Sequence, residues 1–144
     1  MTVLEVSAVL VVALVAAAVV LVVAFTVRRR SLQRGGGFDM SLRQGRRWTG
    51  GWVFGIGRFR GDDLEWFRTF SVTWRPSQVL VRRVVTVRER RRPSRQEAYD
   101  LPAGHVVMSC LVAGRELEVS MSERAETAFL AWLEAAPPGE HLVA

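Results

Sequence analysis

The longest uncharged segment of the chain runs from Val6 to Val27, and it constrains the fold more than any other feature. Within it only Ser7 and Thr26 are polar. As a helix rising about 1.5 Å per residue, the segment matches a hydrocarbon core of about 30 Å. A cleaved signal peptide would have a basic start and a shorter apolar core, whereas this chain starts with MTVLE. The sequence therefore predicts a transmembrane helix over residues 6–27 after a short N-terminus, residues 1–5.

Positive charge gathers on only one side of this predicted helix. No Lys or Arg precedes it, and four arginines follow it closely: Arg28, Arg29, Arg30 and Arg34. Positively charged flanks are retained in the cytoplasm. We therefore expect a single-pass protein of the inner (cytoplasmic) membrane, with its N-terminus outside and its C-terminal domain in the cytoplasm. The single cysteine, Cys110, excludes an intramolecular disulfide and agrees with a reducing compartment.

Residues 28–37 are predicted to form a basic linker, and the glycines Gly35 to Gly37 are typical of a flexible hinge. At roughly 3.5 Å per residue such a linker reaches about 35 Å at most, so the domain that follows stays near the membrane. One β domain is expected over residues 38–136, since the chain has room for a single core. Residues 137–144 are expected to be a flexible tail.

Alternating apolar residues predict short strands in this domain. They are expected near residues 38–43, 52–56, 64–74, 79–90, 106–112 and 117–121. In the third, Leu64, Trp66, Phe70, Val72 and Trp74 are the apolar members, and Pro76 ends the strand because proline cannot donate to a ladder. The glycines of GIGRFR, which departs from the dinucleotide-binding pattern GxGxxG, indicate a bent strand or a close backbone approach.

The apolar pattern changes to a helical period after Ser122, a predicted N-cap. Glu123 and Glu126 fall in the first turn, where the helix dipole favours acids. The apolar face comprises Ala125, Phe129, Trp132, Leu133 and Ala136, and Pro137-Pro138 ends the helix. The predicted fold is an N-terminal transmembrane α-helix plus a mainly-β domain, a bent antiparallel sheet or barrel capped by one C-terminal amphipathic helix.

This order of elements resembles the pleckstrin-homology-like barrel. In that architecture the terminal helix commonly carries an aromatic residue packed into the barrel opening, a position that Trp132 would fill here. The resemblance implies an architecture and carries no function by itself.

Three stretches also resemble a known family: FDMSLR from Phe38, GWVFGIGRFRGDDLEWFRTFS from Gly51, and MSERAETAFLAWLEAAPPG from Met121. Together with the leading hydrophobic span, they are similar to uncharacterised actinobacterial single-pass membrane proteins that share a domain of unknown function. The resemblance covers nearly the whole chain. It implies the topology and the fold described above, and it implies no reaction.

Side chains suited to catalysis are few and scattered. His105 follows Gly104 at a predicted turn, and Cys110 falls on the apolar side of a strand. One cysteine and two distant histidines make no zinc pattern, and the adjacent Asp62 and Asp63 are not expected to hold a metal. We expect no enzymatic activity, no cofactor and no small-molecule substrate. A small membrane-bound enzyme built around His105 is an alternative.

Charge is distributed unevenly along the chain. All basic residues are arginine, and the net charge is +3 over residues 1–34, +9 over residues 35–95 and −6 over residues 96–144. The stretch VRRVVTVRERRRPSR, residues 81–95, is the most basic. Arg82 and Arg88 are expected on the polar face of a strand, whereas Arg83 breaks the alternation at a bulge or at the edge of the core.

Four interpretations of these arginines are open: a solvated face, contact with anionic lipid, nucleic-acid binding, and an acidic protein partner. Trp48 is a further candidate for the headgroup level, because amphipathic rings and arginine coexist there. The candidate contacts for anionic lipid or a partner are Arg28, Arg29, Arg30, Arg34, Trp48, Arg82, Arg88, Arg90, Arg91, Arg92 and Arg95.

The leading hypothesis from the sequence is a membrane protein without enzymatic activity. Its basic cytoplasmic domain would sit at the anionic inner leaflet as a docking or accessory module for a membrane complex. The expected partners are anionic membrane lipids and another membrane or membrane-associated protein. A membrane-tethered nucleic-acid-binding protein is an alternative, although no helix-turn-helix, RNP or zinc-finger pattern is found.

Overall fold

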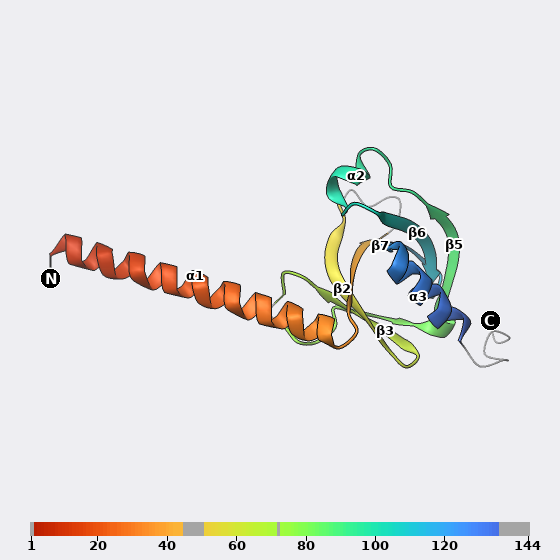
Figure 1. Cartoon of the computed structure of the whole chain (residues 1–144), viewed down its shortest axis with the longest axis horizontal. Helices are drawn as coiled ribbons and strands as arrows, with labels where there is room; N and C mark the ends of the chain where they lie inside the picture. The colour runs from red at the N-terminus through yellow and green to blue at the C-terminus, as the bar shows by residue number, and fades with distance from the viewer. Residues whose placement is uncertain (1, 45–50, 72, 136–144) are drawn as a thin grey trace.

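The computed structural model describes residues 2–44, 51–71 and 73–135, and shows a long helix that projects from a β domain (Figure 1). The helices are α1 (Val3–Arg34), the 3-10 turn η1 (Arg82–Val84), α2 (Glu97–Asp100) and α3 (Glu123–Glu134). The strands are β1 (Phe38–Gln44), β2 (Val53–Arg60), β3 (Asp63–Arg68), β4 (Gln78–Val81), β5 (Val85–Arg91), β6 (His105–Val112) and β7 (Arg115–Ser122).

Helix α1 is the one helix in the described residues that is long and apolar enough to cross a membrane, judged by length and composition. Thr2 and Glu5 form a capping box at its start. The two polar residues of the apolar segment bond within the helix: Ser7 Oγ donates to the Leu4 carbonyl at 2.8 Å, and Thr26 Oγ1 donates to the Val22 carbonyl at 2.8 Å. These hydroxyls therefore need no other partner in an apolar medium.

The linker predicted over residues 28–37 is wrong for most of its length. Helix α1 continues through Arg34 without a break, and only the glycines that follow make the turn into β1. The reason is local, because no residue between Arg28 and Arg34 opposes a helix, whereas Gly36 adopts a φ of +84° that ends it.

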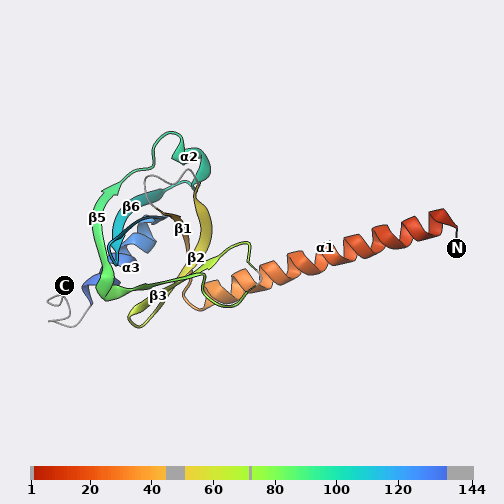
Figure 2. The ribbon, with the colours of Figure 1, turned by 180° about the vertical axis from the view of Figure 1, so that it is seen from behind.

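All seven strands form one antiparallel sheet in the order β4-β3-β2-β1-β7-β6-β5. Strands β4 and β5 are therefore the two edges, although only η1 separates them in the chain. Three residues can join opposite edges only if the sheet curls round on itself, as Figures 1 and 2 show. The predicted class, a bent antiparallel sheet followed by a C-terminal helix, is confirmed.

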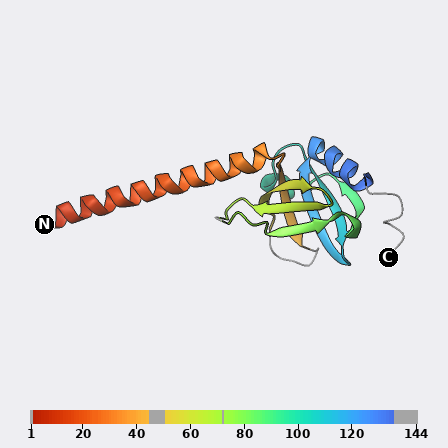
Figure 3. The same ribbon diagram turned by 90° about the horizontal axis from the view of Figure 1, so that it is seen from below.

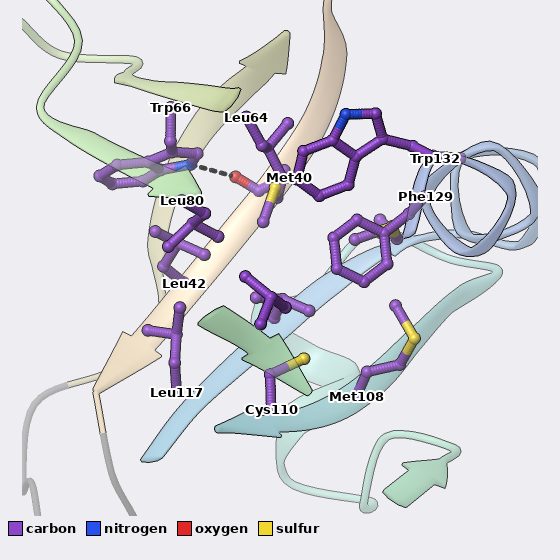
Figure 4. Packing of buried hydrophobic residues seen from close by; sticks show 14 residues of the cluster. Met40, Leu42, Leu64, Trp66, Leu80, Met108, Cys110, Leu117, Phe129 and Trp132 are labelled. Carbon is purple, nitrogen blue, oxygen red and sulfur yellow. Dashed lines mark hydrogen bonds between the residues drawn. The ribbon is translucent and has the colours of Figure 1, made fainter. Parts of the chain in front are cut away.

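The core lies inside the curl (Figure 4). Trp66 is buried there, and its Nε1 donates to the Met40 carbonyl at 2.9 Å. Helix α3 begins at the predicted N-cap, where Ser122 Oγ accepts from the Ala125 amide at 3.2 Å. It closes the open side with Phe129, which is fully buried, and Trp132, whose Nε1 donates to the Gly61 carbonyl at 2.8 Å. Trp132 therefore packs onto the core cluster and ties α3 to the β2–β3 turn.

Phe54 and Ile56, apolar residues of the predicted second strand, lie outside the main core cluster. Ile56 packs on the outer side of the sheet with Leu32 and Phe67, and Phe54 is 39% exposed. Glycines take the inward positions instead. A Cβ at Gly57 would lie 3.0 Å from Met40 Sδ, so the close approach expected of these glycines is confirmed.

The third predicted strand is too long. Strand β3 ends at Arg68, and beyond it Phe70 is 85% exposed and Trp74 is 60% exposed. The ladder stops because Arg68 already pairs with Gly55, close to the start of β2. Beyond this point the sheet offers little partner strand, and the chain leaves it as a loop.

The fourth predicted strand is two strands, β4 and β5, separated by η1. Arg83 breaks the alternation because it lies in the 3-10 turn where the chain crosses between the sheet edges. The register shifts between Val87 and Glu89, which makes Arg88 the extra residue of a bulge. The short helix α2 was not predicted. Ala136, predicted for the C-terminal helix, and the predicted tail, residues 137–144, lie outside the described residues.

Candidate functional site

The C-terminal end of α1 is packed against the outer face of β2 and β3. Leu32, Ile56 and Phe67 form a small cluster in which each is at most 2% exposed. Gly37 allows the close approach, since a Cβ there would lie 2.8 Å from Ile56 Cγ2 and would overlap the Leu32 carbonyl oxygen. The helix and the domain therefore share a buried contact immediately before β1.

Arg28 forms the second contact between α1 and the domain, and it is only 5% exposed. Its guanidinium donates from Nη1 to the Arg68 carbonyl at 2.9 Å, and from Nε and Nη2 to the Thr73 carbonyl at 3.1 and 3.0 Å. The Arg68 carbonyl lies at the end of β3, and the Thr73 carbonyl lies in the segment between β3 and β4. Arg28 is consequently a structural clamp, and the expectation that it contacts lipid is wrong for this residue.

The segment held by Arg28, of which the structure describes residues 69–71 and 73–77, is named the β3–β4 loop. It runs beside the end of α1 in two views (Figures 1 and 3). Trp74 lines a recess together with Leu21, Ala24, Phe25, Val27 and Arg28 of α1. The loop thus reaches back along the helix, past its basic end, to residues of the apolar segment.

The other arginines at the end of α1 lie on the surface. Arg29 pairs with Asp39 at 3.4 Å, and both side chains are about half exposed, so the pair adds little stability. Arg30 and Arg34 are exposed, and no carboxylate of the described residues lies within ion-pair distance of them. These three guanidinium groups remain available at the junction of helix and domain.

Two arginines of the basic stretch, Arg82 and Arg90, form ion pairs within the domain. Arg82 pairs with Asp62 at 2.9 Å and lies over the Trp132 ring at 5.1 Å. Arg90 pairs with Glu126 of α3, whose side chain is 8% exposed. Each of these pairs joins elements that are distant in sequence and neutralises charge at the edge of the core.

Arg91 is the centre of the largest charge network. It makes two bonds to the Glu97 carboxylate, at 2.6 and 2.8 Å, and Glu97 also accepts from Arg43 at 2.8 Å. Arg43 in turn contacts Glu118. The hydrogen bonds from Arg91, together with the Ser94 amide and the charge of Arg43, lower the pKa of Glu97 to about 2 although burial opposes this shift. The network ties α2 to the outer surface of the sheet.

Arg88, Arg92 and Arg95 remain exposed, and no carboxylate of the described residues lies within ion-pair distance of them. Strand β5, which carries Arg88, lies on the side of the domain turned away from α1 in Figures 1 and 2. The structure therefore does not bring Arg88 onto one surface with the arginines that follow the apolar segment. Trp48 lies outside the described residues.

Of the residues considered for catalysis, His105 is half-buried and lines a recess that Glu123 also lines, whereas Cys110 is buried. His105 Nδ1 lies 3.3 Å from Ser120 Oγ, but Ser120 is fully buried. Burial lowers the pKa of His105, and the charge of Asp39 opposes that shift. Burial also raises the pKa of the Cys110 thiol to about 12. Within the described residues no three His, Cys, Asp or Glu side chains are grouped as metal ligands.

The exposed aromatic residues of the β3–β4 loop were missed as candidates, because their alternation suggested a strand. The sequence does contain a signal for them. The segment TFSVTWRPS combines two aromatic residues, an arginine and no acid, and it ends beside a proline. Such a composition is typical of a membrane-interface segment. It indicates one only when the segment lies next to a helix that could cross the membrane.

Fold and junction together define a class of protein, a curled β domain fused without a linker to one long apolar helix. The chain belongs to the family described as "Protein of unknown function (DUF2550)", whose model matches residues 14–139. This confirms the family resemblance noted from the sequence.

Relatives occur in mycobacteria. "Uncharacterized protein Rv1312" of Mycobacterium tuberculosis is 33% identical over 92 residues, which are 60% of this chain and 62% of that protein. "Uncharacterized protein ML1147" of Mycobacterium leprae is 32% identical over 92 residues, which again are 60% of this chain and 62% of that protein. The matched region thus spans less than two thirds of these relatives.

Proposed function

We propose that this chain is a single-pass protein of the inner membrane whose cytoplasmic β domain is a docking or accessory module for a membrane complex, without catalytic activity. The observation that carries the proposal is the junction. Helix α1 passes from the apolar segment into the domain unbroken and is clamped there by Arg28. A domain mounted in this way stays at the leaflet and presents fixed surfaces to its neighbours.

Charge supports the proposed orientation. Arg29, Arg30 and Arg34 follow the apolar segment and are exposed, whereas no basic side chain precedes it. Basic flanks favour the cytoplasmic side, where anionic lipid attracts each guanidinium by about 1 kcal/mol. The N-terminus would then lie outside the cell and the domain inside.

The topology favours a binding module. Two antiparallel meanders, β1–β4 and β5–β7, meet through the β1–β7 pair, and α3 fills the opening. This arrangement supports the proposed likeness to the pleckstrin-homology-like barrel, an architecture that presents loops and edges for contacts. The likeness is one of architecture, so it supports a role in binding without naming the ligand.

We assign the exposed Arg88, Arg92 and Arg95 to a partner with an acidic surface. Strand β5, which carries Arg88, lies on the side of the domain turned away from α1 (Figure 1). For this reason we propose that Arg88 contacts a protein partner and not lipid. Crosslinking in native membranes tests this. Replacing these three arginines with Ser should remove discrete crosslinked species, whereas replacing the exposed Arg115 and Arg124 should leave them; equal loss from both variants would refute the assignment.

A reporter fused after Ala144 tests the topology. A reporter that is active only in the cytoplasm should be active, and one that requires export should be silent. Replacing the exposed Arg29, Arg30 and Arg34 with Ser should reduce this bias, with Arg28 kept so that the clamp remains. Activity of the exported reporter in the unaltered chain would refute the proposed orientation.

A further inference from the structure

We propose that the β3–β4 loop enters the cytoplasmic headgroup region of the bilayer beside α1, with the rings of Phe70 and Trp74 at the boundary with the acyl chains. Its ligand is the lipid surface itself. The inference rests on the proposed single-pass topology, and it adds a second membrane contact that the apolar helix alone would not supply.

The position of Trp74 along α1 fixes its depth. The hydrocarbon segment can begin no earlier than Val6, because Glu5 is charged. About 20 helical residues are needed to cross it, which places its cytoplasmic boundary near Phe25. Trp74 shares its recess with Leu21, Ala24 and Phe25. An indole beside these residues lies at the membrane boundary whenever the helix crosses the bilayer.

The loop is held at this depth by the protein. Arg28 binds the Arg68 carbonyl, at the end of β3 just before the loop, and the Thr73 carbonyl within the loop. Within the loop Ser71 Oγ lies 2.9 Å from Thr73 Oγ1 and also accepts from the Thr73 amide at 3.3 Å. The internal polar groups are thus partly satisfied, so the loop does not depend on water for all of its hydrogen bonds.

The side chains that the loop exposes suit an interface between water and lipid. Phe70 is 85% exposed and Trp74 is 60% exposed, whereas the other described tryptophans, Trp52, Trp66 and Trp132, are buried. Arg68 and Arg75 flank them and are exposed, and residues 68–77 contain no acid. Aromatic rings beside arginine are favoured at the headgroup level, where the rings meet acyl chains and the guanidinium meets phosphate.

Labelling at single cysteines in the full chain tests the inference. In a Cys110→Ala background, an environment-sensitive fluorophore is attached at Phe70→Cys or Trp74→Cys, and the protein is placed in vesicles of phosphatidylcholine and phosphatidylglycerol. Val15→Cys, in the apolar segment, serves as the membrane reference, and Tyr99→Cys, 87% exposed in α2, serves as the water reference.

The proposal expects blue-shifted emission at positions 70 and 74, and a loss of fluorescence when the lipid carries a nitroxide at the headgroup or on the upper acyl chain. The label at 15 lies in the middle of the span, so its quenching is measured with a nitroxide at the end of the acyl chain. The label at 99 should show neither effect. The label at 70 leaves Trp74 in place, so it reports on a loop that retains its contact with α1.

Two results overturn the proposal. They differ in whether the proposed membrane topology fails together with it. If the label at 15 is quenched while those at 70 and 74 behave as the label at 99, the loop does not enter the membrane but the membrane-spanning helix stands. If the label at 15 is also unquenched, the proposed topology fails together with the loop. Quenching at 70 and 15 with none at 99 supports both.

Discussion

At the scale of single residues, a part of the arginine excess neutralises carboxylates at the edge of the core. Glu65, Glu97, Glu118 and Glu126 are all buried, and each is paired with arginine. A buried carboxylate without its partner would be costly to keep charged. A basic stretch that suggests a binding surface therefore has a structural role at several of its positions.

Replacing Glu97 with Gln should destabilise the protein at neutral pH by about 2–3 kcal/mol, since it removes the carboxylate charge that pairs with Arg91 and Arg43. Thermal unfolding of the full chain in detergent micelles measures the loss. Asp100→Asn, an exposed change in the same short helix, is the matched control and should have little effect.

Acid should erase the difference between the native chain and the Glu97→Gln variant. The pKa of Glu97 is lowered to about 2 in the folded state, from an ordinary value of 4.5. The charged carboxylate therefore contributes its full stabilisation at a pH above 4.5. That contribution is lost as the pH falls from about 4.5 toward 2. A difference in stability that is constant over this range would contradict the role given to the Arg91–Glu97 pair.

At the scale of elements, α3 and η1 close the opening of the curled sheet together. Trp132 stacks near Phe59 at 5.4 Å, lies under Arg82, and bonds to the Gly61 carbonyl in the turn between β2 and β3. One side chain thus connects the C-terminal helix to both edges of the opening. Helix α3 therefore contributes side chains to the core of the domain.

Replacing Trp132 with Ala should cost about 3–5 kcal/mol, because it removes a buried indole and its hydrogen bond and leaves a cavity. Leu130 lies on the same helix and is 36% exposed, so Leu130→Ala should lower the free energy of unfolding far less. Thermal unfolding of both variants in detergent provides the comparison. Equal losses would show that α3 contributes helical content but no specific packing at the opening.

At the scale of the whole molecule, helix and domain form one continuous body. The cluster of Leu32, Ile56 and Phe67 and the clamp of Arg28 lie on the same side of the junction. A flexible tether would let the domain sample many orientations above the membrane, whereas this junction selects one. Orientation is therefore set by buried contacts, with surface charge in a secondary role.

Spin labels at Val20 in α1 and Tyr99 in α2, both exposed, should give a narrow distance distribution in membranes when Cys110 is replaced by Ala. Inserting two glycines between Arg34 and Gly35 should broaden it, because the insertion separates the helix from its contacts on the sheet. A distribution that is already broad without the insertion would refute the rigid junction.

The sequence by itself determined those features that depend on neighbouring residues. The apolar segment, the alternation of Met40 and Leu42, and the N-cap at Ser122 follow from local periodicity and local hydrogen bonds, so each is found where it was predicted. The curled class of fold followed from the order of these elements.

Only the tertiary structure decided which arginines are buried, which face of β2 packs inward, and where the chain leaves β3. Arg28 and Arg30 are two residues apart and alike in sequence, yet one is buried and the other exposed, because Arg68 and Thr73 meet only the first. Trp66 and Trp74 would lie on the same face of the predicted third strand, yet Trp66 lies in the core and Trp74 lies beside α1. Contacts between residues about 40 positions apart set these outcomes, and local sequence patterns do not encode them.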